Sequence, residues 1–200
     1  MLFIGFSGED ELSEALARRC VEHVFPDITF HSMRPRQGGI SGVKKQFRKY
    51  VTTANSYPIL VMIDLDAEEC PPSARSGLLA EHNIAELPRQ LILSIIKREA
   101  EAWLLGDSNG IAEYLGIPNR DITERPEELA DPKVAIIDLA RTSARYRDEI
   151  CPDARGDAKV GPGFNFRLTE FVRHQWDVET AAERCPTLMR TLERLRNLKD

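Results

Sequence analysis

The stretch Ile59-Leu60-Val61-Met62-Ile63-Asp64-Leu65-Asp66 decides the fold of this chain. Its beginning is apolar and rich in β-branched residues, and it follows directly on Tyr57-Pro58. After it comes the polar, proline-containing stretch 67–73. A short apolar run of this kind is typical of a strand buried on both faces, as in a parallel α/β sheet. The stretch therefore predicts a buried strand over 59–64 with acids at its end.

Asp64 and Asp66 stand where this strand is expected to run out. Residues i and i+2 of a strand point the same way and lie about 7 Å apart. Both carboxylates can then reach one hard cation, Mg²⁺ or Mn²⁺, directly or through water. Ligand sites in open α/β sheets lie at the carboxyl ends of the strands. The pair predicts a metal site, and the alternative is a solvated loop with ordinary acids.

The sequence around this run alternates strands with helices, which predicts a parallel or mostly parallel sheet flanked by helices. Further strands are expected over 2–6, 28–33 and 91–96. The first helix is expected to begin at residues 9–11 and to end at Pro26. A second is expected to begin at a Ser41 cap and to run to Ala54. Two further helices are expected over 84–89 and over 99–105. After residue 107 we expect only helices and loops, with helices over 108–115, 133–147, 166–174, 178–184 and 186–198. We therefore predict an α/β core over 1–107 and a helical C-terminal part over 108–200 that packs on it.

The composition describes a soluble globular protein, because 42% of the residues are hydrophobic and 30% are charged. A net charge of −5 does not indicate nucleic-acid binding by the whole surface, although a local basic patch would permit it. The cysteines show no CxxC spacing, which argues against a zinc site or a disulfide framework and favours a cytoplasmic location. No run approaches the roughly 20 apolar residues that span a membrane.

A second acidic cluster, Glu9-Asp10-Glu11, follows the first predicted strand. Strand one is often the neighbour of the central strand, so this cluster and Asp64 are expected at one edge of the sheet. Such a grouping is the arrangement of a Mg²⁺-dependent phosphoryl-transfer site, in which Glu9 or Glu11 acts as the general base. The alternative is structural, because acids in a first helical turn favour the helix dipole.

Glu101 is a further candidate metal ligand, because it lies just past the last predicted strand. Its alternative is an acid on the helix surface that pairs with Lys97 at i−4.

A basic segment surrounds the glycines at 38, 39 and 42. Backbone amides of a glycine-rich loop, with cationic side chains nearby, can hold a phosphate backbone. The alternative is a solvated face of a helix that buries Val43, Phe47 and Val51. The candidate nucleic-acid-binding residues are Arg34, Arg36, Lys44, Lys45 and Arg48.

Several sequence pieces spread along the chain match one known family. They are Phe6-Ser7-Gly8-Glu9-Asp10-Glu11, the strand with Asp64 and Asp66, Glu101-Ala102-Trp103-Leu104-Leu105-Gly106-Asp107, Asp131-Pro132-Lys133, Val160-Gly161-Pro162-Gly163-Phe164-Asn165 and Trp176-Asp177. On these pieces the chain resembles the bacterial Toprim-like proteins of unassigned function, which are often encoded beside AAA-type ATPases. The Glu-Ala-Trp-Leu-Leu-x-Asp and Val-Gly-Pro-Gly-aromatic pieces are specific together, whereas the short acidic motifs are weak alone.

The resemblance implies phosphodiester chemistry on nucleic acid. Toprim folds occur in topoisomerases, primases and nucleases of the overcoming-lysogenization type, where the glutamate after strand one is an acid/base or a metal ligand and the DxD pair holds Mg²⁺. The implied function is a Mg²⁺-dependent nuclease or phosphotransferase on DNA or RNA, with a role in phage defence. The implied partners are an AAA-type ATPase and a second copy of the chain.

The chain departs from the Toprim pattern at Ser7. Toprim proteins usually place the glutamate immediately before the glycine of this turn, which is the position of Ser7. Either Glu9 takes over through a shifted turn, or the chain is a catalytically degenerate partner or regulatory subunit of an ATPase. Loss of a general acid/base lowers a rate by about 10²–10⁴-fold.

Overall fold

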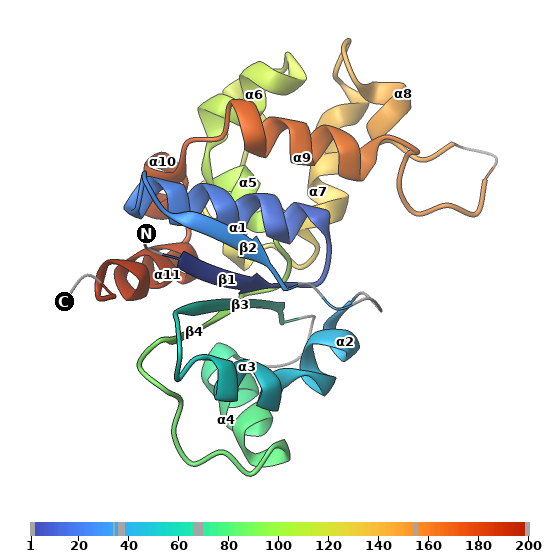
Figure 1. Ribbon diagram of the computed structural model, residues 1–200. Helices are drawn as coiled ribbons and strands as arrows, with labels where there is room; N and C mark the ends of the chain where they lie inside the picture. The colour runs from blue at the N-terminus through green and yellow to red at the C-terminus, as the bar shows by residue number, and fades with distance from the viewer. Residues whose placement is uncertain (1–2, 34, 36–38, 66–69, 154–155, 199–200) are drawn as a thin grey trace. The chain divides into compact units, whose positions relative to one another are not determined.

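The computed structural model describes residues 3–33, 35, 39–65, 70–153 and 156–198 (Figure 1). The chain folds as two compact units. Unit 1 comprises Met1–Lys97 with Thr187–Asp200, and unit 2 comprises Arg98–Pro186. The predicted domain division at residue 107 stays a prediction.

Unit 1 is built on a parallel sheet, which confirms the α/β fold class. The sheet strands within the described residues are β1 (Phe3–Ser7), β2 (Thr29–Ser32), β3 (Ile59–Asp64) and β4 (Leu91–Ile96), in the order β2-β1-β3-β4. All three pairings are parallel. The pairs Gly5↔Ile59 and Asp64↔Ile96 fix the register of β3 between its neighbours. The apolar run that predicted a strand buried on both faces therefore lies inside the sheet.

Helices cover both faces of this sheet (Figure 1). One face packs on α2 (Ile40–Lys45), α3 (Phe47–Thr53) and α4 (Pro71–Glu81). Residues of β3 and β4 that point to this face form a core with Val43, Phe47, Tyr50, Leu78 and Leu79. The other face packs on α1 (Glu11–Val24) and on α11 (Pro186–Arg196), where Ser94 Oγ of β4 lies 2.6 Å from Thr191 Oγ1.

The acidic cluster after β1 has a structural role at the start of α1. The Asp10 side chain accepts a hydrogen bond from the Ser13 N–H over 2.9 Å, and Ser13 Oγ accepts one from the Asp10 N–H over 3.1 Å. This reciprocal cap satisfies backbone groups that a helix start leaves without partners. Glu11 and Glu14 lie in the first turn, where negative charge favours the helix dipole.

One predicted helix was wrong in its extent and another in its position. The helix expected from Ser41 to Ala54 begins instead after Gly39, whose φ of +77° favours glycine, and it breaks at Gln46 into α2 and α3. The helix expected over 84–89 is absent from those described residues, and α4 lies in the preceding stretch. Pro71 starts α4 because the first helical position needs no N–H donor.

Unit 2 is helical throughout its regular structure, as predicted for the C-terminal part of the chain. Its α-helices within the described residues are α5 (Glu101–Gly106), α6 (Ser108–Leu115), α7 (Pro132–Arg141), α8 (Arg147–Ile150), α9 (Phe164–His174) and α10 (Val178–Arg184). The predicted helices over 108–115 and 178–184 are confirmed, whereas the one over 133–147 ends at Arg141. In the part of the chain that the structure describes, no helix combines the length and the apolar character needed to cross a membrane.

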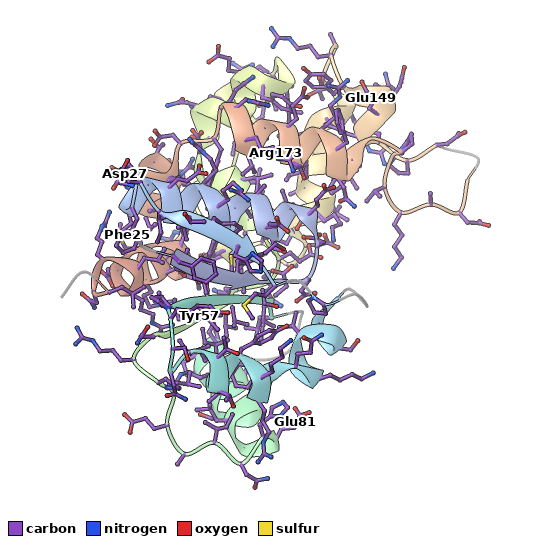
Figure 2. The ribbon with its side chains drawn as sticks, viewed as in Figure 1. Phe25, Asp27, Tyr57, Glu81, Glu149 and Arg173 are labelled. Atoms are coloured by element: carbon purple, nitrogen blue, oxygen red, sulfur yellow. The ribbon has the colours of Figure 1, made fainter. Side chains whose placement is uncertain are left out.

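The Val160-Gly161-Pro162-Gly163 piece of the family resemblance has a packing role in unit 2. The Gly161 N–H donates to the Ile150 carbonyl over 3.0 Å, and the Gly163 N–H donates to the Glu149 carbonyl over 2.9 Å. Glu149, labelled in Figure 2, lies on α8. A Cβ at Gly161 would overlap the Glu149 carbonyl oxygen and lie 2.6 Å from the Cys151 carbonyl oxygen. Glycine is required there because backbone lies directly against backbone.

Candidate metal and phosphodiester site

The turn after β1 and the end of β3 meet at the carboxyl edge of the sheet. Because β1 pairs directly with β3, residues that follow Ser7 come close to those that follow Val61. Glu9 Oε1 accepts a hydrogen bond from the backbone N–H of Asp64 over 3.0 Å. Both residues are partly exposed. A carboxylate from one strand end is thus fixed to the backbone of an acidic residue at another.

Gly8 makes this turn possible. A Cβ at Gly8 would lie 2.5 Å from Phe6 Cζ and 2.8 Å from Ser13 Oγ, so a side chain there would displace the start of α1 or the Phe6 ring. The Glu9 carbonyl also accepts the Gly39 N–H over 3.1 Å, which ties the turn to the start of α2. Glu9 is therefore held through both its side chain and its backbone.

Ser7, the position of the usual Toprim glutamate, belongs to the core. Its side chain is fully buried, and Ser7 Oγ donates to Tyr50 Oη over 2.8 Å. Burial raises the pKa of Tyr50, and the hydrogen bond from Ser7 offsets part of that rise. A glutamate at this position would be surrounded by core residues, whereas Glu9 points its carboxylate to the end of β3.

The remaining predicted residues of this edge have different positions. Glu11 is exposed in the first turn of α1, next to the cap formed by Asp10. Asp66 lies outside the described residues. Within the residues that the structure describes, no three His, Cys, Asp or Glu side chains are grouped closely enough to hold a metal ion. The described part of the site consists of Glu9 and Asp64.

Glu101 belongs to unit 2, at the start of α5. It is buried, and its carboxylate lies 3.5 Å from Lys133 Nζ, which also contacts Glu99 Oε1 at 3.1 Å. Burial lowers the pKa of Lys133, but the charges of Glu101 and Glu99 outweigh it and raise that pKa above its ordinary value. The alternative of an acid on the helix surface was wrong, because Glu101 is buried and forms an ion pair with Lys133. Its role as a metal ligand stays a prediction.

The predicted basic segment is described only in part, because Arg34 and Arg36 lie outside the described residues. Lys44 is half-buried in the last turn of α2, and Lys45 beside it is exposed. Arg48 Nε donates to the His82 carbonyl over 2.9 Å, which joins α3 to the end of α4. Arg48 thus has a structural contact, while Lys45 lies on an exposed helix face.

A second basic group escaped the sequence interpretation. Arg75 of α4 and Arg190 and Arg194 of α11 line one cavity of about 470 Å³ beside β4. The spacing of Arg190 and Arg194, four residues apart, places them on one helix face and was a usable signal. Their proximity to Arg75 depends on packing and could not be found from spacing.

No family model matches the chain, and no curated protein matches it. Among solved structures, the chain is similar to the "C-terminal region of the Burkholderia pseudomallei OLD protein", with 19% identity and a TM-score of 0.44. That similarity covers 99% of this chain and 98% of the other.

Proposed function

We propose that this chain is a metal-dependent phosphodiester hydrolase that acts on DNA or RNA, with Mg²⁺ or Mn²⁺ as its cofactor. The observation that carries this proposal is the hydrogen bond from the Asp64 N–H to Glu9 Oε1. It brings two carboxylate residues together at the carboxyl edge of a parallel sheet, where ligand sites of open α/β sheets lie. The Toprim resemblance of the sequence supports the same chemistry.

The donor chemistry of Glu9 and Asp64 fits a hard divalent cation. Mg²⁺ is usually held by one or two carboxylates, with water and substrate phosphate oxygens as the other ligands. A carboxylate offers about four acceptor positions, so the hydrogen bond to Glu9 does not exhaust its capacity. Asp66 is proposed as a further ligand from the i, i+2 spacing. The bound cation would polarise the phosphodiester and orient the attacking water.

Glu9 is the proposed general base, and Glu11 is the second candidate for that role. A general base must reach the proton of the attacking water, which requires contact with solvent or substrate. Glu9 is partly exposed, and hydrogen bonds to its side chain and to its carbonyl hold it in place. Glu11 is exposed in the first turn of α1. The basic residues Lys44 and Lys45 follow the loop that contacts Glu9, and we propose that they attract the nucleic-acid backbone.

Amide substitutions test this proposal with little change in shape. Asp64→Asn retains the backbone N–H, and Glu9→Gln retains an acceptor oxygen, so the link between the two is preserved. Each variant is expected to lower metal-dependent cleavage of labelled DNA or RNA by about 10²–10⁴-fold, and Asp64→Asn to weaken Mn²⁺ binding measured by calorimetry. Glu22→Gln is the matched control, because Glu22 is partly exposed and its carboxylate lies 3.9 Å from Arg18 Nη1, a long ion pair.

The proposal fails if purified protein cleaves no nucleic acid with Mg²⁺ or Mn²⁺, also when the candidate ATPase is added. It fails equally if Asp64→Asn and Glu9→Gln retain full cleavage. A role in phage defence would follow from the activity, and it is measured as the plating efficiency of phage on cells that carry wild-type or Asp64→Asn protein.

A second candidate function is a non-catalytic partner or regulatory subunit of an AAA-type ATPase. The observation that favours it is the burial of Ser7 against Tyr50, which leaves the usual Toprim glutamate position inside the core. In that case the chain binds the ATPase or a second copy of itself and changes the ATPase rate without cleaving nucleic acid. Sedimentation of the mixed proteins and the rate of ATP hydrolysis measure this, and robust cleavage by the wild-type chain alone would exclude it.

A further inference from the structure

The outer edge of β4 is flanked by helices on both faces of the sheet. β4 ends the strand order, so its outer backbone groups have no neighbouring strand within the described sheet. α4 lies on one face of β4, and α11 contacts the other face through Thr191. Arg194 Nη1 of α11 donates to the Leu93 carbonyl over 2.6 Å. An arginine thus occupies a position where the strand edge offers an acceptor.

The cavity beside this edge is basic. Its volume is about 470 Å³, and its lining contains the guanidinium side chains of Arg75, Arg190 and Arg194 together with the hydroxyl residues Ser94 and Thr191. None of the described residues that line it is acidic. Arg75 comes from one face of the sheet, and the other two arginines come from the opposite face. The edge of β4 lies between them.

No acid of the described residues pairs with the positive charges in this cavity. Among the described residues, none of Arg75, Arg190 and Arg194 forms an ion pair with a carboxylate. Burial lowers the pKa of Arg194, and the charges of Arg75 and Arg190 lower it further. Arg190 and Arg194 are exposed, so solvent weakens the repulsion between the like charges of this cavity. An anion held between them would remove the repulsion that remains.

A second cavity extends the basic surface along β4. It has a volume of about 380 Å³ and shares Arg194 with the first. Its lining includes Arg89, whose Nη2 donates to the Asn197 carbonyl over 3.3 Å. A strand of six residues spans about 20 Å. Arginines therefore line this edge from before the start of β4 to near its carboxyl end.

We propose that this arginine groove, defined by Arg75, Arg89, Arg190 and Arg194, binds the sugar-phosphate backbone of a nucleic-acid strand. The identity of the ligand rests on the proposed function, whereas the preference for phosphate rests on the groove itself. Arginine presents a planar fork of donors that matches phosphate oxygens. Contacts of this type position a strand without reading its sequence.

The groove lies next to the candidate metal site in the sheet. Ile95 lines the groove and precedes Ile96, which is the register partner of Asp64 on β3. Neighbouring strands are about 4.8 Å apart. A strand of nucleic acid held along the edge of β4 can therefore place a following phosphodiester at the carboxyl end of β3, where Glu9 and Asp64 lie.

The test uses the full chain without metal, so that binding is separated from cleavage. Arg75→Gln with Arg190→Gln removes two charges and leaves Arg194, which supports the β4 edge. Binding of a fluorescein-labelled single strand of about 20 nucleotides is measured by anisotropy in EDTA at several salt concentrations. We expect the double variant to bind at least tenfold more weakly, with a salt slope smaller by about 1.4. The matched control is Arg120→Gln with Arg125→Gln, whose side chains are 86% and 76% exposed in unit 2.

The outcomes of this test judge binding by the arginine groove independently of cleavage at the candidate metal site. Unchanged affinity and salt slope in the double variant, or an equal loss in the control, would overturn the groove while leaving metal-dependent cleavage intact. Binding that depends on the groove, without any cleavage by the wild type, would support the groove and overturn the hydrolase. If calorimetry shows inorganic phosphate bound through Arg75 and Arg190 but no oligonucleotide bound, the groove takes a small phosphate and the strand-binding inference is wrong.

Discussion

Glu9 and Asp64 are 55 residues apart in the chain, and the carboxylate of the first accepts the backbone N–H of the second over 3.0 Å. The contact depends on the parallel pairing of β1 with β3, which aligns the carboxyl ends of both strands. In the proposed site, Glu9 would supply the carboxylate that the Toprim resemblance leads one to expect at Ser7. The turn through Gly8 places the next available carboxylate beside the end of β3.

Ser7→Glu, which would place a glutamate where the Toprim resemblance implies one, is expected to damage the fold. Ser7 is fully buried against Tyr50, so the new carboxyl group would be larger and desolvated. We expect a loss of about 2–5 kcal/mol in the free energy of unfolding, measured with urea. Ser7→Ala is the control and is expected to lose about 1 kcal/mol, because only one hydrogen bond disappears. A Ser7→Glu protein with full stability and increased cleavage would show that Ser7 marks the true acid/base position.

Gly161→Ala is expected to destabilise unit 2 by more than about 2 kcal/mol, because overpacking against rigid backbone shifts the chain. The added methyl group would overlap the Glu149 carbonyl oxygen. The control Gly156→Ala has room, since a Cβ there meets its nearest neighbours at 3.8 Å. Thermal unfolding of both variants measures the difference, and equal stability of the two would contradict the packing role of this glycine.

Acid is expected to weaken the contact of Glu170 with Arg167 and Tyr114. Hydrogen bonds from Arg167 and Tyr114, both of 2.8 Å, lower the pKa of Glu170 below its ordinary value of 4.5. The folded state therefore favours ionised Glu170, and this stabilisation is complete above pH 4.5 and is lost as the pH falls through the folded-state pKa.

The difference in free energy of unfolding between wild type and Glu170→Gln, here called the stability gap, measures the contribution of this contact. Unfolding by urea from about pH 6 to pH 3 should show the gap close as the wild-type carboxylate becomes protonated. A gap that does not change over this range would mean that the ionised carboxylate of Glu170 contributes nothing to folding.

Thr191→Val is expected to lower the free energy of unfolding by about 1–3 kcal/mol, because the buried hydroxyl of Ser94 loses its partner. The two oxygens are 2.6 Å apart, and Thr191 Oγ1 also donates to the Thr187 carbonyl. Adding Ser94→Ala should recover part of the loss, since no hydroxyl then remains without a bond. A double variant as unstable as the sum of both single variants would contradict this coupling.

The sequence was sufficient for the features of the fold that depend on local pattern. The run 59–63 and the run 91–96 contain almost only apolar residues, and both form buried parallel strands. The helix over 178–184 was placed correctly, and Asp177 caps it by accepting a hydrogen bond from the Thr180 N–H. Local patterning failed at Pro71, because proline was interpreted as a loop residue although it also begins helices.

Only those residues of the candidate site that stand at the ends of predicted strands could be predicted from the sequence. Asp64 and Glu9 stand at the ends of buried strands. Their position at the same edge of the sheet could therefore be predicted from the sequence. The burial of Ser7 and the enclosure of Glu101 with Lys133 depend on contacts between distant segments. The arginine groove depends on them too, because α4 and α11 are more than a hundred residues apart in the chain.

The return of α11 to the sheet has a consequence for the order in which unit 1 folds. Residues up to Lys97 supply all the strands of the described sheet, but Leu188, Leu192 and Leu195 of α11 are fully buried. During synthesis the sheet therefore emerges long before the helix that completes one of its faces. Contacts of such long sequence separation form late and slow the folding of a domain. A nascent chain that stops at Pro186 would present the apolar surface of β4 to chaperones or to other chains.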